Sequence, residues 1–269
     1  MPSPRSLPSA ALWTIVILSL PAPPSRADEP AADGPWIQLF NGRDLEGWTP
    51  KIAGYAAGDN HAHTFRVRDG LLCVDYSDYT GPFNDRFGHL FYKVPFSHYL
   101  LRLEYRVVGQ QYPGGPDWGF ANSGIMIHGQ SPESMSLDQS FPVSLEVQLL
   151  ASKPDNPQPT GSVCTPGTHI VVDGQLYTPH RLLAKSQAFP IGEWVTAEVE
   201  VHGGQLIRHK INGQTVLEYS DPQLDADDAE AKRLLAAGAD KKVTSGTISL
   251  QSESHPIEFR KVELKRLAD

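Results

Sequence analysis

The strongest constraint on the fold is a run of short alternating segments separated by turn signals. Residues 192–220, GEWVTAEVEVHGGQLIRHKINGQTVLEYS, contain three segments in which apolar and polar side chains alternate. Such alternation is typical of β-strands that bury one face. Gly203-Gly204 and Asn212-Gly213 separate the three segments, and Asn-Gly favours the type I′ turn of a hairpin. This stretch therefore predicts three consecutive antiparallel strands.

The same pattern recurs along most of the chain. Alternating runs bounded by Gly, Pro, Asn or Ser occur again in residues 63–76, 89–109, 245–254 and 257–267. One helix is predicted near residues 225–237, with Asp225 as its N-cap and Gly238 just past its end. Many short strands and a single helix indicate an all-β chain, folded as an antiparallel two-sheet sandwich of jelly-roll type.

The first 27 residues have the pattern of an export signal. Arg5 gives a positive start, residues 11–20 form an apolar core too short to span a bilayer, and small residues precede a cleavage site after Ala27. A retained membrane anchor is the alternative interpretation. We expect an exported protein, periplasmic or secreted, whose mature form has no membrane contact.

Composition limits what the mature chain can do. Residues 28–35 have the composition of a linker, and residues 36–269 form one predicted domain. Without the two arginines of the export signal the net charge is −10, so nucleic acid is not an expected partner. Cys73 and Cys164 could pair in an oxidising compartment, but two buried free thiols are the favoured alternative. Neither CxxC nor HExxH occurs, and no metal or other cofactor is predicted.

One strand carries polar side chains in a regular pattern. In residues 143–150 (VSLEVQLL) the odd positions are apolar, while Ser144, Glu146 and Gln148 are polar. If the odd positions form the core, the polar side chains lie together on the opposite face, with about 6.6 Å between alternate residues. These side chains could line a groove.

Two neighbouring segments add to that face. The same parity places Asn122, Met126 and His128 on one face of their strand, so His128 is predicted to reach Glu146 if the two strands pair. Ser249, Gln251 and Glu253 likewise point away from the core. Amides and carboxylates in fixed places suit sugar hydroxyls, and Trp118 in an adjacent loop could stack on a pyranose ring. The alternative is that these residues are ordinary solvent-facing positions and that Trp118 belongs to the core.

The acids on this face limit its chemistry. Glycosidases need two carboxylates, and jelly-roll laminarinases carry them at alternating positions of one strand. This strand offers only Glu146, so an ordinary glycoside hydrolase would need Asp138 or Glu253 as its second acid. A single base suits another reaction. When a sugar carries a ketone at C3, a base removes the C2 proton and the C1 substituent leaves by β-elimination. Glu146 or His128 is the candidate base, and His128 or Gln148 is the candidate donor to the enolate oxygen.

Several segments, in order, resemble one protein family. They cover nearly all of the mature chain: LFNGRDLEGW (39–48), NSGIMIHG (122–129), LEVQLL (145–150), PTG (159–161), GEWVTAEVEVHGGQLIRHKING (192–213), GTISLQ (246–251) and EFRKVEL (258–264). The chain resembles the 3-keto-disaccharide hydrolase domain family. The resemblance implies a concanavalin-like jelly roll and action on 3-keto-glycosides, by hydrolysis or by elimination and hydration. It also implies a site at Asn122, His128, Glu146, Gln148 and Gln251.

The leading hypothesis is an exported enzyme that cleaves 3-keto-glycosides. Its predicted catalytic residues are Glu146 and His128, and its predicted substrate-binding residues are Asn122, Gln148, Gln251, Trp118 and Asp138. An oxidoreductase acting upstream on sugar C3 would supply the ketone. The alternatives are a carbohydrate-binding module without catalysis and an ordinary glycoside hydrolase. The oxygen-rich loop around Asp138 leaves room for a divalent cation such as Ca²⁺.

Overall fold

The computed structural model describes Met1 and residues 34–152 and 157–268. From residue 33 onward the chain forms one unit. The predicted export signal and most of the predicted linker lie outside the described residues. Within the described part of the chain, no helix is both long and apolar enough to cross a membrane.

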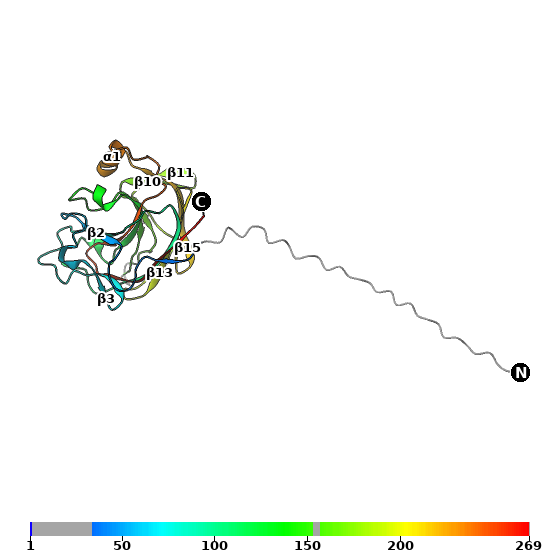
Figure 1. Ribbon diagram of the computed structural model, residues 1–269, viewed down its shortest axis with the longest axis horizontal. Helices are drawn as coiled ribbons and strands as arrows, with labels where there is room; N and C mark the ends of the chain where they lie inside the picture. The colour runs from blue at the N-terminus through cyan, green and yellow to red at the C-terminus, as the bar shows by residue number, and fades with distance from the viewer. Residues whose placement is uncertain (2–33, 153–156, 269) are drawn as a thin grey trace. The chain divides into compact units, whose positions relative to one another are not determined.

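The described strands form two antiparallel sheets (Figure 1). The seven-stranded sheet has the order β12-β9-β8-β7-β16-β5-β2. Its strands are β2 (Trp48–Ile52), β5 (Gly88–Tyr92), β7 (Gly124–Gly129), β8 (Leu145–Gln148), β9 (Val163–Cys164), β12 (Arg181–Leu182) and β16 (Thr247–Ser252). This sheet carries the segments in which the sequence places the site.

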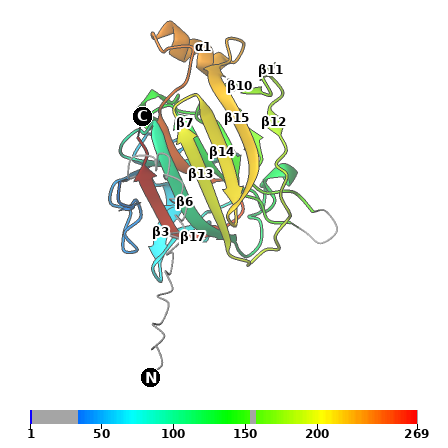
Figure 2. The same cartoon turned by 90° about the vertical axis from the view of Figure 1, so that its right-hand side faces the viewer.

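The ten-stranded sheet (Figure 2) has the order β11-β10-β15-β14-β13-β6-β17-β4-β3. Strand β1 also pairs with β17. The strands of this sheet are β1 (Ile37–Gln38), β3 (Phe65–Arg68), β4 (Leu71–Val74), β6 (His98–Val107), β10 (Thr168–Val172), β11 (Gln175–Tyr177), β13 (Val195–His202), β14 (Leu206–Ile211), β15 (Gln214–Leu224) and β17 (Ile257–Arg266). The predicted strands and the all-β two-sheet sandwich are confirmed.

The core lies between the two sheets. Burial alternates along β6 and β13, where every second side chain is buried. The buried apolar side chains of both sheets, such as Leu103, Val147 and Leu250, belong to one cluster. Each buried aliphatic side chain of this size contributes about 1.5–3 kcal/mol to folding. The alternation that predicts these strands is therefore the pattern that makes the sandwich stable.

Hairpin turns lie at Asn212-Gly213, as predicted, and at Asp69-Gly70. Asp69 and Gly70 both have positive φ (53° and 77°), and so do Asn212 and Gly213 (48° and 79°). Two consecutive residues with positive φ define the type I′ turn, whose twist matches that of the flanking strands. Both turns join strands that pair with each other, β3 with β4 and β14 with β15.

The helix α1 (Ala229–Ala236) begins later than predicted. Asp228, not Asp225, is its N-cap and accepts hydrogen bonds from the backbone N–H groups of Glu230 and Ala231. Asp225 instead accepts a hydrogen bond from Asp227 N at 2.8 Å, so it forms a turn that precedes the helix. Gly238 has φ 93° and lies just past the C-cap, as predicted.

The two cysteines are free and buried, which confirms the favoured alternative. Cys73 lies in β4 of the ten-stranded sheet, whereas Cys164 lies in β9 of the seven-stranded sheet.

His209 is a buried structural residue of β14. Its Nδ1 contacts the Gly161 carbonyl oxygen at 2.8 Å and its Nε2 contacts the Tyr219 hydroxyl at 2.9 Å. A carbonyl only accepts hydrogen bonds, so Nδ1 donates and Nε2 accepts from Tyr219. Burial lowers the pKa of His209 to about 4.

We expect His209→Leu to destabilise the protein by about 2–4 kcal/mol, because two buried groups lose their hydrogen-bond partner. The folded pKa lies below the ordinary value of 6.5. The stabilisation that His209 gives the wild-type fold is therefore complete above pH 6.5 and is lost as the pH falls toward 4. Denaturant unfolding at pH 7.5 and pH 5 measures both effects. A cost for the variant that is equal at the two pH values would contradict the second expectation.

Candidate active site

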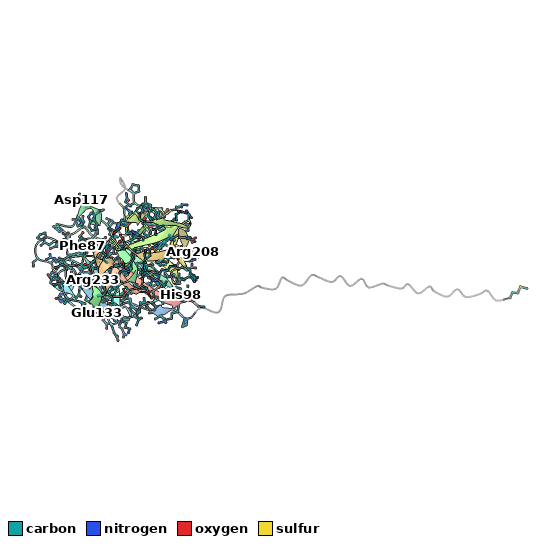
Figure 3. All side chains as sticks on the ribbon, turned by 90° about the horizontal axis from the view of Figure 1, so that it is seen from above. Phe87, His98, Asp117, Glu133, Arg208 and Arg233 are labelled. Carbon is teal, nitrogen blue, oxygen red and sulfur yellow. The ribbon has the colours of Figure 1, made fainter. Side chains whose placement is uncertain are left out.

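A cavity of about 600 Å³ lies over the face of the seven-stranded sheet that points away from the core. Its polar lining includes Asn122, Glu146, Gln148, Arg181 and Glu253, and its aromatic lining includes Trp118, Phe120 and Phe141. Figure 3 labels Asp117, which also lines the cavity, on the side of the molecule away from Arg208. Glu146 and Gln148 lie on the polar face of β8. They are nevertheless buried, because loops cover this face.

Strand register places Glu146 within a row of directly opposed residues. Glu146 of β8 lies opposite Met126 of β7 on one side and opposite Cys164 of β9 on the other. Cys164 in turn lies opposite Arg181 of β12. Directly opposed residues of an antiparallel pair point to the same face. The row therefore directs Glu146 and Arg181 to the same cavity, with only the small side chain of Cys164 between them.

Gly124 creates space for two side chains of the site. A Cβ atom at Gly124 would lie 2.7 Å from Glu146 Cγ, 2.8 Å from Glu146 Oε1 and 3.1 Å from Gln251 Oε1. The two oxygens thus converge above this glycine. Both are buried and have no hydrogen-bond partner among the described residues. A pair of unmatched acceptors at one point suits a ligand that brings hydroxyl donors.

Glu146 and Glu253 are two buried carboxyl groups in the same cavity. Burial raises the pKa of Glu146 to about 8, although the positive charge of Arg181 opposes the rise. Burial also raises the pKa of Glu253 well above 4.5, and the charge of Glu146 raises it further. Ionising both groups together is unfavourable, so near neutral pH this pair retains protons that exposed glutamates would lose.

Amides and aromatic rings complete the cavity. Gln148 Nε2 lies 3.5 Å from Asn122 Oδ1, and Asn122 Nδ2 lies 3.4 Å from the Trp118 carbonyl oxygen. The Trp118 ring stacks on Phe87 with 5.3 Å between centroids, yet the residue is 55% exposed. A supported ring with one open side can stack on a sugar. The structure thus brings Asn122, Gln148 and Trp118 together around Glu146, while Gln251 is fully buried beside it.

The expectation that His128 reaches Glu146 is wrong. His128 has a positive φ of 50°, and the pairing of β7 with β16 shifts register beside it. This irregularity breaks the alternation from which its face was predicted. His128 Nε2 lies 2.9 Å from the carbonyl oxygen of Gly203, in the β13–β14 turn of the other sheet, and donates to it. His128 lines a separate cavity of about 240 Å³ beside α1.

Asp138 is also not where it was predicted to be. It is exposed and does not line the large cavity, and its charge acts on the buried Lys51. Across the described residues, no group of three or more His, Cys, Asp and Glu side chains is arranged to hold a metal ion. Two further residues line the cavity. The sequence predicted Glu253 only as a possible second acid, and it did not identify Arg181.

We expect Gly124→Ala to reduce activity at least ~10²-fold with the fold retained, because the new methyl group displaces Glu146 and Gln251 from their shared space. Activity and thermal melting are measured together. Gly88→Ala is the matched control, since a Cβ there would meet Ile52 Cγ1 at 2.9 Å, in the core and away from the cavity. Equal activity losses in the two variants at equal stability would contradict this role for Gly124.

We expect Glu253→Gln to stabilise the protein at pH 8 by at least about 1 kcal/mol, or ~2–4 °C in Tm. The raised folded pKa means that the native state keeps a proton that the unfolded state loses above pH 4.5. Wild-type stability therefore falls as the pH rises above 4.5, and the amide removes this penalty. Thermal melts at pH 4 and pH 8 test the difference, which should vanish at pH 4.

Glu258→Gln serves as the control for this comparison. Glu258 is also buried, but it accepts hydrogen bonds from Arg106 at 2.7 and 2.8 Å. Its loss should destabilise the protein at pH 8. Stabilisation by both substitutions, or by neither, would contradict the expectation for Glu253.

Comparison with known proteins gives a family and a fold. A family model described as the 3-keto-alpha-glucoside-1,2-lyase-like domain matches residues 35–265. A solved structure from Parabacteroides distasonis ATCC 8503, assigned as a glycosyl hydrolase, has a TM-score of 0.51 at 19% identity, covering 87% of this chain and 94% of its own. The laminarinase from Rhodothermus marinus has a TM-score of 0.51 at 11% identity, covering 90% and 100%. Likeness at such low identity shows the jelly-roll sandwich alone. No curated protein gives a significant match.

Proposed function

The chain belongs to the 3-keto-alpha-glucoside-1,2-lyase-like family, and from this premise we propose that it cleaves 3-keto-glycosides in the cavity over β8. The family makes it a carbohydrate-active enzyme. Cleavage of 3-keto-glycosides is supported above all by two buried carboxyl groups in one cavity. Glu146 and Glu253 both have raised pKa values. Such a pair can hold one acid and one base at the same pH.

The proposed reaction begins at sugar C2. The Glu146 carboxylate removes the C2 proton, and the C–H electrons form an enolate whose negative charge lies on the C3 oxygen. The C3 carbonyl then re-forms as a C1–C2 double bond develops and the C1–O bond breaks. The Glu253 carboxyl group gives its proton to the leaving oxygen. Water added across the new double bond would complete a hydrolysis.

In this scheme one carboxyl group gains a proton and the other loses one. After one turnover Glu146 holds the proton taken from C2, and Glu253 is ionised. Transfer of one proton from Glu146 to Glu253 restores the starting state. The raised pKa values support these roles, because a catalytic acid or base works best when its pKa lies near the working pH.

The rest of the cavity supports recognition of a sugar. The amides of Asn122 and Gln148 and the Oε1 atom of Gln251 offer donors and acceptors for hydroxyl groups. Trp118 offers an aromatic face. The pattern of residues 1–27 supports export, and an oxidoreductase acting on sugar C3 would supply the substrate.

An ordinary glycoside hydrolase is the second candidate, because two carboxyl groups in one cavity are also what that reaction needs. The two reactions differ in their requirement for the ketone. Elimination needs the acidity that the ketone gives to C2, whereas ordinary hydrolysis does not.

We expect purified residues 28–269 to release the aglycone from a C3-keto glucoside and not from the matched unoxidised glucoside. Glu146→Gln should lower kcat at least ~10²-fold, the usual contribution of a general base. Glu258→Gln, outside the cavity, should leave kcat unchanged. Comparable release from the unoxidised glucoside would favour an ordinary hydrolase. Sugar binding without release of the aglycone from either compound would indicate a carbohydrate-binding module.

A further inference from the structure

Arg181 holds two hydrogen-bond donors that the described residues leave without an acceptor. Its Nε and Nη2 atoms are buried and unpartnered, and its side chain lines the cavity. The two-residue strand β12 holds it there by pairing with β9. Burying a charged donor without an acceptor costs free energy, so a group that is absent from the chain itself is expected to accept from it.

Several other arginines among the described residues pair with carboxylates. Arg102 contacts Glu198 and Glu263, and Arg208 contacts Glu200 and Glu218. These ion pairs lie on the ten-stranded sheet, away from the cavity. Arg181 has a carboxylate nearby, since its charge lowers the pKa of Glu146, yet its Nε and Nη2 do not bond to it. Both side chains line the same cavity, so a ligand bound there can accept from Nε and Nη2.

Arg181 and the candidate base Glu146 point to the same face and line the same cavity, so both can contact one sugar. A base that takes the C2 proton lies beside C2, and the C3 oxygen is carried on the adjacent carbon. Two amide donors lie beside Glu146: Gln148 Nε2, which is 3.5 Å from Asn122 Oδ1, and the Nε2 of Gln251, which has no partner among the described residues. Both are neutral, whereas Arg181 carries a positive charge. A planar guanidinium is well suited to a developing oxyanion, because it presents parallel N–H groups and keeps its charge.

We propose that Nε and Nη2 of Arg181 form the oxyanion site of this cavity, and that they bind the C3 oxygen of the substrate as it becomes an enolate. The inference rests on the proposed function and adds a residue to it. A donor that stabilises charge formed only in the transition state raises kcat and leaves substrate binding nearly unchanged. A permanent substrate carboxylate, as in an acidic sugar, would use the same donors but would be bound already in the ground state.

Steady-state kinetics on a neutral C3-keto glucoside distinguish an enolate formed during the reaction from a carboxylate that the substrate carries permanently. We expect Arg181→Ala to lower kcat by ~10²–10³-fold, as for the loss of an oxyanion donor, with KM changed less than about threefold. Arg181→Lys should recover only part of the rate, since it keeps the charge without the planar fork. Added guanidinium chloride at non-denaturing concentration should partly restore kcat in Arg181→Ala.

A second readout is the pH profile. Removing Arg181 removes the charge that opposes the raised pKa of Glu146. The acidic limb of kcat/KM should therefore move to higher pH in Arg181→Ala. Thermal melting establishes that each variant is folded. Arg208→Ala, which removes an arginine of the ten-stranded sheet that does not line the cavity, should change neither the limb nor kcat and should not respond to guanidinium.

Three outcomes would overturn the proposal. Unchanged kinetics in folded Arg181→Ala would remove Arg181 from the reaction while leaving the proposed function intact. A raised KM with unchanged kcat would assign Arg181 to a ground-state anion instead. A wild-type protein that is inactive on the keto glucoside would overturn the proposed function and this inference together.

Discussion

The burial of Glu146 and Glu253 is the constraint on which the site depends. Glu146 lies on β8 and Glu253 directly follows β16, and the two residues are only 5% and 2% exposed. A buried carboxylate is costly unless it is paired, so both groups favour the protonated form. The sandwich tolerates this cost because the opposite face of the same strands packs a large apolar core.

Small residues make the arrangement sterically feasible. Gly124 leaves room for Glu146 and Gln251 on one side, where even a methyl group would lie within 3.1 Å of both oxygens. Cys164 leaves room on the other side, so that Arg181 on the next strand directs its side chain to the same cavity. Regular cross-strand register then holds the groups at fixed separations. The small residues on both sides of Glu146 thus leave room for an acid, an amide and a cation near one another.

The sequence is informative where the strands are regular. Alternation in β8 places Glu146 and Gln148 on one face, and the structure agrees because β8 pairs without a register shift. The same reasoning fails for His128, since a bulge beside it breaks the alternation. Arg181 is not predictable in this way. Its strand has only two residues, and the chain returns to pair with β9 only after forming β10 and β11 in the other sheet.

Burial acts on histidine and glutamate in opposite directions, and this decides which residues near the cavity can exchange protons. It lowers the pKa of His180, which lines the cavity, and it lowers the pKa of His255, two residues from Glu253, to about 4. Both imidazoles are therefore neutral at pH 7 and hold no ionisable acidic proton to give. Burial raises the pKa of Glu146 and Glu253, so these groups can give or take a proton near pH 7. In the proposed mechanism a histidine is therefore not the general acid, and the carboxyl pair takes that role.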